Sequence, residues 1–209
     1  MNPNNLILKI CPISFNKTFS KILDKLHYAG NCRPTGRYIR FILAIDSEIV
    51  GGLILRSTIP HVTGRDKFFG IYKFRLKGRI PNSKSEYWQY LNKIPNMARA
   101  FILPKYQGKG LGIQMIKLIE KRAIPIWEQK YKDNAIGIDC LDIAPPEKAK
   151  IFLLNNWRFL GKTKGYSREK RVPFGGQNRD QDNPIIGKMK KIHPSWYIYG
   201  KKFDYNSPI

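Results

Sequence analysis

The sequence has few acidic residues, and it contains no long apolar run. Its 209 residues include 15 Asp and Glu against 38 Lys and Arg, which gives a formal net charge of +23. Such a basic excess predicts attraction to polyanions, most commonly nucleic acid and alternatively an anionic membrane surface. A solvated, Lys-rich surface without such a partner is the third explanation. Of the three, we expect nucleic acid.

Cysteine and histidine are also scarce. The three cysteines, Cys11, Cys32 and Cys140, lie far apart, and no CxxC pair or Cys/His metal spacing occurs. We therefore expect no metal site and a reducing, cytoplasmic location. The opening residues MNPNNLILKICPISF are too weakly apolar and basic for a signal peptide. Without about eighteen consecutive apolar residues, no membrane-spanning helix is expected.

Hydrophobic periodicity predicts an α/β fold. Helical spacing of apolar residues predicts a helix over 17–28, and two apolar runs around Asp46-Ser47-Glu48 predict an antiparallel hairpin over 38–55. The remaining predicted elements are strands over 68–76, 97–103 and 135–141, a helix after residue 112 that Pro125 kinks or ends, a helix over 145–155 and a last strand after residues 157–161.

These elements predict one domain over residues 1–165, with a central sheet of antiparallel and parallel strands flanked by helices. Residues 166–209 are predicted to form a basic, aromatic-rich extension packed on the same domain. Within that extension, SWYIYG is capable of forming a strand. No internal repeat and no clean linker divides the chain.

Residues 104–117, PKYQGKGLGIQMIK, place three glycines between a predicted strand and a predicted helix. The first turn of a helix has free N–H groups, its dipole attracts anions, and glycine lets phosphate oxygens approach the backbone. The turn lacks the GK[ST] end of a P-loop and the GxGxxG spacing of a dinucleotide fingerprint. We interpret it as a cradle for another phosphate-containing ligand, or else as a glycine-rich helix entry.

The stretch QGKGLG resembles the Q/R-x-x-G-x-G/A pyrophosphate loop of the GNAT N-acetyltransferase superfamily. The preceding LPKYQ and the order of elements over roughly residues 17–165 are similar as well. The resemblance implies a GNAT-like mixed α/β fold with acetyl-CoA, or a related acyl-CoA, as cofactor. The cofactor-binding residues that it implies are Ile102, Leu103, Gln107, Gly108, Lys109, Gly110, Leu111 and Gly112.

One GNAT feature is missing. Phe152 stands where the superfamily commonly has a tyrosine that protonates the leaving thiolate, and phenylalanine has no proton to give. Either another group takes this part or the reaction is not ordinary acetyl transfer. Tyr166, Asp139, Cys140 and Asp142 are the substitutes in the right part of the chain.

Several stretches in order also resemble the Mom-type DNA-modification proteins of phages: His27-Tyr28, FILAIDSEIVGGLIL, Arg65-Asp66, Ala98-Arg99 and NWRFLGKTKGYSR. The resemblance implies an acetamido-type group added to adenine N6 in double-stranded DNA, with the base flipped out. The catalytic residues expected for this reaction are Tyr28, Arg99, Asp139 and Tyr166. The nucleic-acid contacts expected are His27, Arg65, Trp88, Lys162, Lys164 and Arg168.

Arg99 is a lone charge in an apolar strand and is expected to face a groove or to pair with Asp66 or Asp139. Two alternatives to DNA modification stay open. One is a conventional acetyl-CoA-dependent transferase acting on a protein, tRNA or small amine. The other is a nucleic-acid-binding protein without catalysis, which Phe152 favours and the intact glycine loop disfavours.

Overall fold

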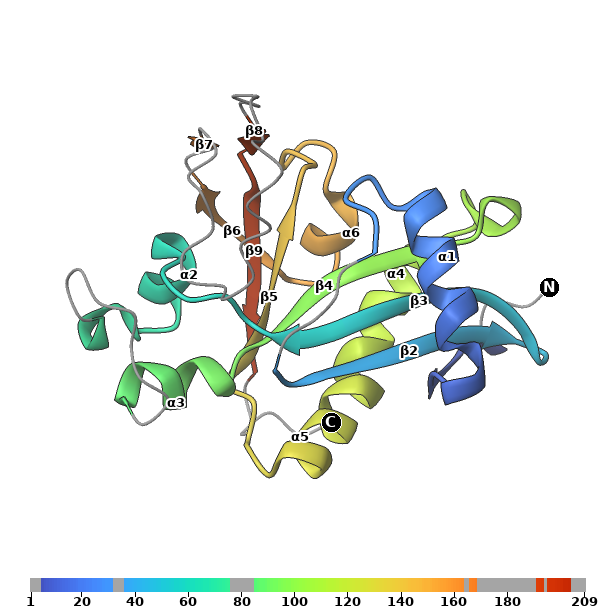
Figure 1. The fold of residues 1–209 in the computed structure, drawn as a ribbon, viewed down its shortest axis with the longest axis horizontal. Helices are drawn as coiled ribbons and strands as arrows, with labels where there is room; N and C mark the ends of the chain where they lie inside the picture. The colour runs from blue at the N-terminus through green and yellow to red at the C-terminus, as the bar shows by residue number, and fades with distance from the viewer. Residues whose placement is uncertain are drawn as a thin grey trace, which may run out of the picture.

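A seven-stranded sheet in the order β1-β2-β3-β4-β5-β9-β6 runs through the centre of the protein (Figure 1). The computed structural model describes residues 5–31, 36–75, 85–163, 166–168, 191–193 and 195–203, with the backbone alone at 166–168 and 191–193. The strands are β1 (Ile7–Ile10), β2 (Tyr38–Ile45), β3 (Glu48–Ser57), β4 (Pro95–Ile102), β5 (Gly137–Asp142), β6 (Arg158–Lys162) and β9 (Tyr197–Lys202). β4 and β5 pair in parallel, whereas the other neighbouring strands pair antiparallel.

The predicted hairpin is confirmed as β2 and β3. Asp46 and Ser47 form its turn with φ angles of 47° and 71°, a backbone that matches the right-handed twist of the two strands. In β3, a Cβ on Gly51 would lie 2.5 Å from the carbonyl oxygen of Phe101 on β4. Glycine is therefore needed for β3 and β4 to approach this closely.

Helices cover both faces of the β1–β4 half of the sheet. α1 (Asn16–Leu26) buries Phe19 and Leu23 against one face. α4 (Leu111–Leu118), a π-helical turn (Ile119–Ala123) and α5 (Ile124–Tyr131) cover the other. The π turn comes just before Pro125, which has no N–H to donate, so the helix changes its hydrogen-bond register there as expected for a proline.

The segment between β3 and β4 contains helices and turns, including at residues 68–74, where a strand was predicted. It contains α2 (Thr63–Phe68), a 3₁₀ turn (Tyr72–Phe74) and α3 (Glu86–Asn92). The strand expected over residues 68–76 is wrong, because Gly70 at φ 74° turns the chain. Phe69 and Ile71 instead pack into an apolar cluster with residues from α3.

One strand from the carboxyl-terminal part of the chain, β9, belongs to the main sheet. β9 lies between β5 and β6, so the expected boundary at residue 165 separates strands that share one sheet. The strand expected at SWYIYG is confirmed as β9, while β7 (Tyr166–Arg168) and β8 (Lys191–His193) form a separate antiparallel pair. The helix expected over 145–155 is reduced to α6 (Lys150–Leu153), since Ala149, with a ψ of 32°, interrupts the helical backbone after the turns at Pro145 and Pro146.

Candidate active site

The sheet splits between β4 and β5. Two residue pairs join these strands, Asn96 with Asp139 and Met97 with Cys140. Beyond them β4 stays paired with β3, and β5 stays paired with β9. The register of β3 against β4 shifts here, and Ala98 is the extra residue of β4. A bulge of this kind bends a strand and re-aims its side chains, and it lies where the gap begins.

A cavity of about 290 Å³ fills the split. It passes through the sheet from the end of α1 on one face to α4 and α6 on the other. Its lining includes Leu26, His27 and Tyr28 after α1, residues 97–102 of β4, Gln107, Gly112 and Met115 around the start of α4, Cys140, Leu141 and Asp142 of β5, and Ile151 and Phe152 of α6.

The glycine turn adjoins one end of this cavity, where Gln107 and Gly112 line it on either side of the turn. Gly108 and Gly110 have φ angles of 74° and 73°, and space is open within 4 Å of where a Cβ would stand on each. Gly110 is the N-cap of α4, and the side chain of Gln107 donates to the carbonyl of Ile102 at 2.9 Å. Free N–H groups of the first helical turn thus lie next to the cavity, as the anion-cradle interpretation predicts.

The eight expected cofactor-binding residues lie together along this end. Ile102, Gln107 and Gly112 line the cavity, whereas Lys109 is exposed in the turn. The Leu103 N–H bonds to β3, and Leu111 is buried in the core. Contacts to a ligand from Leu111 would therefore come from its backbone, because its side chain anchors the start of α4.

His27 and Tyr28 form the wall that follows α1. The N–H of Ala29 donates to Nδ1 of His27 at 3.1 Å. Burial, helped by the charge of Arg99, lowers the pKa of His27 to about 4. The imidazole is therefore neutral at pH 7, and its Nε2–H is a donor. The Tyr28 ring lies 4.5 Å from the His27 ring and 5.8 Å from Trp196.

Tyr28 and Asp142 face the same part of the cavity. Burial, then the charge of Asp142, raises the pKa of the Tyr28 hydroxyl well above its usual range, so it keeps its proton at neutral pH. Oδ1 of Asp142 accepts a hydrogen bond from the Ala144 N–H at 2.9 Å. Burial also raises the pKa of the Cys140 thiol, with the carboxylate of Asp142 adding to the effect. A proton donor and a carboxylate are thus both present.

Arg99 lines the cavity, but its partners differ from those expected. Its guanidinium donates to the carbonyls of Gly30 at 2.8 Å, Ala98 at 2.6 Å and Ala29 at 3.3 Å. The expected pairing with Asp66 or Asp139 is wrong. Arg99 instead fixes the chain after α1 against β4 and places a positive charge beside the cavity.

Phe152 lies on α6, in the wall of the cavity. It is 1% exposed, lines the cavity and stacks on Tyr199 with the ring centroids 4.8 Å apart. The Tyr199 hydroxyl donates to the carbonyl of Ala144 at 2.6 Å, and burial raises its pKa to about 12. Sequence reasoning missed Tyr199, although its alternation with Tyr197 in YIYG was a signal that both rings share one face.

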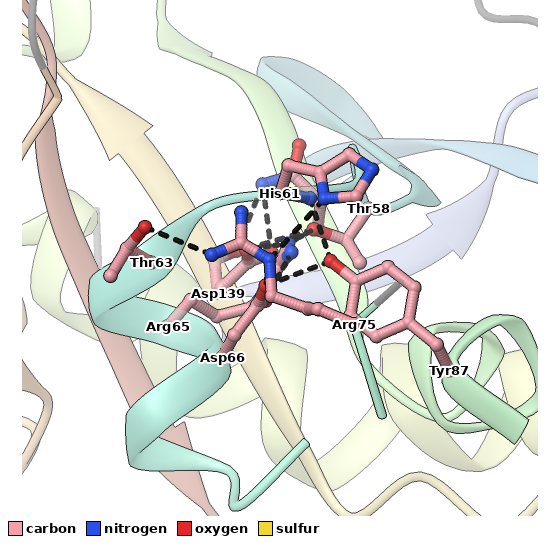
Figure 2. Close-up of polar contacts among 9 residues, drawn as sticks. Thr58, His61, Thr63, Arg65, Asp66, Arg75, Tyr87 and Asp139 are labelled. Carbon is pink, nitrogen blue, oxygen red and sulfur yellow. Dashed lines mark hydrogen bonds and ion pairs between the residues drawn. The ribbon is translucent and has the colours of Figure 1, made fainter. Parts of the chain in front are cut away.

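Asp139 and Arg65 belong to a buried polar network on the face of β5 opposite the Cys140 side chain (Figure 2). Both are 0% exposed. Oδ2 of Asp139 accepts from Thr58 at 2.8 Å and lies 3.2 Å from Nη1 of Arg65, while Oδ1 accepts from Asn96 at 2.9 Å. Neither side chain reaches the cavity or solvent. The catalytic role expected for Asp139 is therefore corrected, and so is the nucleic-acid contact expected for Arg65.

The network continues through Asp66 toward the surface. Asp66 is bound by Arg65, by the Tyr87 hydroxyl at 2.8 Å and by Arg75 at 3.1 Å. Arg75 also donates to the side chains of His61 at 3.3 Å and Thr63 at 3.0 Å. Each carboxylate in this network is paired with a cation and with neutral donors, as burial of charge requires.

The remaining expected nucleic-acid residues lie apart. Trp88 is half-buried on α3, which leads into the start of β4, away from the cavity at the other end of that strand. Lys162 is exposed on β6, 5.0 Å from the centre of the Tyr197 ring. Lys164 and the side chains of Tyr166 and Arg168 lie outside the described residues.

Within the described ranges, no group of three or more His, Cys, Asp or Glu is placed to hold a metal ion. In the same part of the chain, no helix has the length and apolar character needed to cross a membrane.

The fold is that of the GNAT acetyltransferases. It is similar to the ribosomal-protein-S18-alanine N-acetyltransferase of Escherichia coli, with 9% identity, a TM-score of 0.50 and coverage of 98% of this chain and 99% of that one. It is also similar to the GNAT-family acetyltransferase of Streptococcus pneumoniae, with 10% identity, a TM-score of 0.50 and coverage of 95% of this chain and 99% of that one. A third similar structure is yncA of Salmonella typhimurium, a putative acetyltransferase solved with its cofactor acetyl-CoA. Its identity is 10% and its TM-score 0.49, and the match covers 98% of each chain. The sequence matches no protein-family model and no curated protein.

Proposed function

We propose that this protein transfers an acyl group from an acyl-coenzyme A to an amine. The observation that carries the proposal is the cavity in the split between β4 and β5, with the glycine turn and the start of α4 at its end. The GNAT fold supports the same function. The turn would hold the pyrophosphate through its N–H groups, and residues 97–102 of β4 would lie along the pantetheine arm.

The bound acyl-CoA would supply a thioester, whose carbonyl carbon is open to attack by an amine. Asp142 would take the proton that the amine loses as the new C–N bond forms, and Tyr28 would give its proton to the sulfur as the C–S bond breaks. Transfer of the proton from Asp142 to Tyr28 would then restore both groups. The Nε2–H of His27 and the charge of Arg99 would stabilise negative charge developing on the carbonyl oxygen.

Calorimetric titration of the full chain with CoA and acetyl-CoA tests the proposal. Gly108→Val and Gly110→Val should each weaken binding by at least about tenfold, because a Cβ fills the cradle and β-branched residues resist positive φ. Gly70→Val is the matched control, since Gly70 has a similar φ of 74° and open surroundings but lies after α2, away from the turn that begins α4. Equal losses in all three variants, or no binding by the unaltered protein, would contradict the proposal.

The net charge of +23 favours a second candidate, in which the acceptor amine is on a nucleic acid. The adenine N6 group of DNA, modified with an acetamido-like group after base flipping, is the form expected from the sequence. Tyr28 and Trp196 beside the cavity would offer rings for stacking. Other acceptors are a protein, a tRNA or a small amine, and the similar E. coli acetyltransferase is named for an alanine of ribosomal protein S18.

Mass spectrometry separates these acceptors. DNA and RNA from cells that produce the protein are digested to nucleosides, and purified protein is incubated with acetyl-CoA and peptide, tRNA or amine acceptors. A new adenosine species in DNA, absent with Asp142→Asn, supports the nucleic-acid acceptor. Unmodified nucleosides together with acetylated peptide or amine would contradict it and support the conventional reaction.

A further inference from the structure

The sheet consists of two halves that meet only briefly. One half is β1-β2-β3-β4 and the other is β5-β9-β6, and the two residue pairs between β4 and β5 are the whole ladder between them. Adjacent strands in a sheet usually share hydrogen bonds along their length. Because this ladder is so short, the angle between the halves needs further support.

The buried network supplies contacts across this junction. Thr58 directly follows β3 and Asn96 lies on β4, whereas Asp139 lies on β5. The hydroxyl of Thr58 and the amide of Asn96 both donate to the Asp139 carboxylate, at 2.8 and 2.9 Å. Two side chains of the first half thus hold one carboxylate of the second half.

Arg65 ties α2 to the same point. α2 contacts β6 and β9, and a Cβ on Gly64 would lie 2.1 Å from the carbonyl oxygen of Leu160. α2 is therefore seated on the second half of the sheet. From there the guanidinium of Arg65 bonds to Thr58 of the first half and pairs with Asp139 of the second. The three side chains form a closed set of contacts around the junction.

The opposite side of the same junction is the floor of the cavity. Met97 and Cys140, which follow Asn96 and Asp139 in the two strands, are paired with each other and line the cavity. Successive residues of a strand point to opposite faces. The network therefore lies directly behind the point from which β4 and β5 diverge.

We propose that Thr58, Asn96 and Asp139 are positioning residues that set the width of the cleft between β4 and β5, and thereby its affinity for acyl-CoA. This inference rests on the proposed function. Hydrogen bonds between fully buried groups are directional, and breaking them leaves unsatisfied groups. Rotation of one half against the other would break them, so the angle at the junction is fixed.

The test compares Thr58→Val/Asn96→Ala with Tyr87→Phe. The double variant removes both donors to Asp139 from the first half without changing any charge. The control removes a buried hydroxyl from the same network, where α3 meets α2 rather than between the halves of the sheet. In the double variant, the Kd for CoA and the KM for acetyl-CoA should rise by about tenfold while kcat changes by less than about threefold. In Tyr87→Phe, the Kd for CoA and the KM for acetyl-CoA should stay within about twofold of their values in the unaltered protein.

Hydrogen exchange gives a readout that needs no ligand. Amides of residues 95–102 and 137–142 should exchange faster in the double variant than in Tyr87→Phe, by more than the difference in Tm between the two variants accounts for. Unchanged CoA affinity and exchange in the double variant, or equal losses of affinity in both variants, would overturn the inference. If the unaltered protein fails to bind CoA, the proposed function is wrong. Faster exchange in the double variant would then still support the claim that these residues fix the junction between β4 and β5, and unchanged exchange would overturn that claim.

Discussion

Neighbouring residues of β5 occupy two very different environments. Asp139 is fully buried and paired with Arg65 on one face. Cys140 and Asp142 line the cavity on the other face or at the strand end. Both carboxylates were candidates from the sequence, but Arg65, Thr58 and Asn96 occupy the carboxylate oxygens of Asp139. A saturated carboxylate stabilises the fold, whereas one that faces a cavity is available to a substrate.

The largest effect is expected on the unfolding free energy, from breaking the buried ion pair of Arg65 with Asp139. Arg65→Met leaves Asp139 without a cation, and losing one member of a buried pair costs about 3–5 kcal/mol of unfolding free energy. In Arg65→Met/Asp139→Asn no charge is orphaned, because Arg75 and Tyr87 still bind Asp66. Denaturant unfolding should therefore show the double variant to be more stable than the single variant. The reverse order would contradict this account of the network.

The pH dependence of Arg65→Met sharpens the same comparison. Burial raises the pKa of Asp139 above its ordinary value of 3.8, and Arg65 opposes that shift. Without Arg65 the pKa rises further, so the folded state is favoured while Asp139 is protonated and loses that stability as the pH rises through the folded pKa. The stability gap to the unaltered protein should widen from pH 4 to pH 8. Unfolding midpoints across this range measure it, and Asp139→Asn in the same background should abolish the widening.

Local patterns allowed much of the fold to be predicted. The hairpin of β2 and β3, the strand before the glycine turn and the helix after it follow from period-2 alternation and turn residues that act within a few positions. The turns at residues 68–74 were missed because the aromatic residues there satisfy a strand pattern as well as a 3₁₀ turn. Only packing against α3 decides between them.

The site was predicted less completely. The glycine turn was identified because its chemistry is contiguous in the sequence. The partners of Asp139 were not, since Arg65 is 74 residues away and nothing local pairs them. Arg99 was recognised as a charge in need of partners, but carbonyl groups satisfy it. Backbone acceptors carry no signature in a sequence.

On the cavity side, Asp142→Asn tests the open carboxylate. The asparagine oxygen can still accept from the Ala144 N–H, so the turn is kept while the base is lost. We expect kcat with an amine acceptor to fall by about 10²–10⁴-fold, with the Kd for CoA nearly unchanged. Stopped-time assays with acetyl-CoA measure the first quantity and calorimetry the second. A fall of less than about threefold would exclude Asp142 as the general base.

A smaller effect is expected at His27. Its pKa of about 4 means that the folded state resists protonation, so the associated stability is present above the ordinary pKa of 6.5 and is lost as the pH falls toward 4. Arg99→Met removes the nearby positive charge and should raise the pKa of His27. An NMR titration of the imidazole nitrogens measures the shift, with His61 as an internal reference outside the cavity. An unchanged His27 pKa would show that burial alone sets it.

The smallest effect is expected at Cys140, because its thiol is buried and its raised pKa suppresses the thiolate. The thiolate is the reactive form, so iodoacetamide at pH 8 should alkylate Cys140 slowly in the folded protein. Asp142→Asn removes a negative charge that helps to raise this pKa and should speed the reaction modestly. Asp139→Asn leaves the cavity side intact and removes the smaller contribution, so its effect should be weaker. Peptide mass spectrometry measures the rates. The opposite order would mean that Asp139, in the buried network, raises the pKa of the Cys140 thiol more than Asp142 at the cavity does.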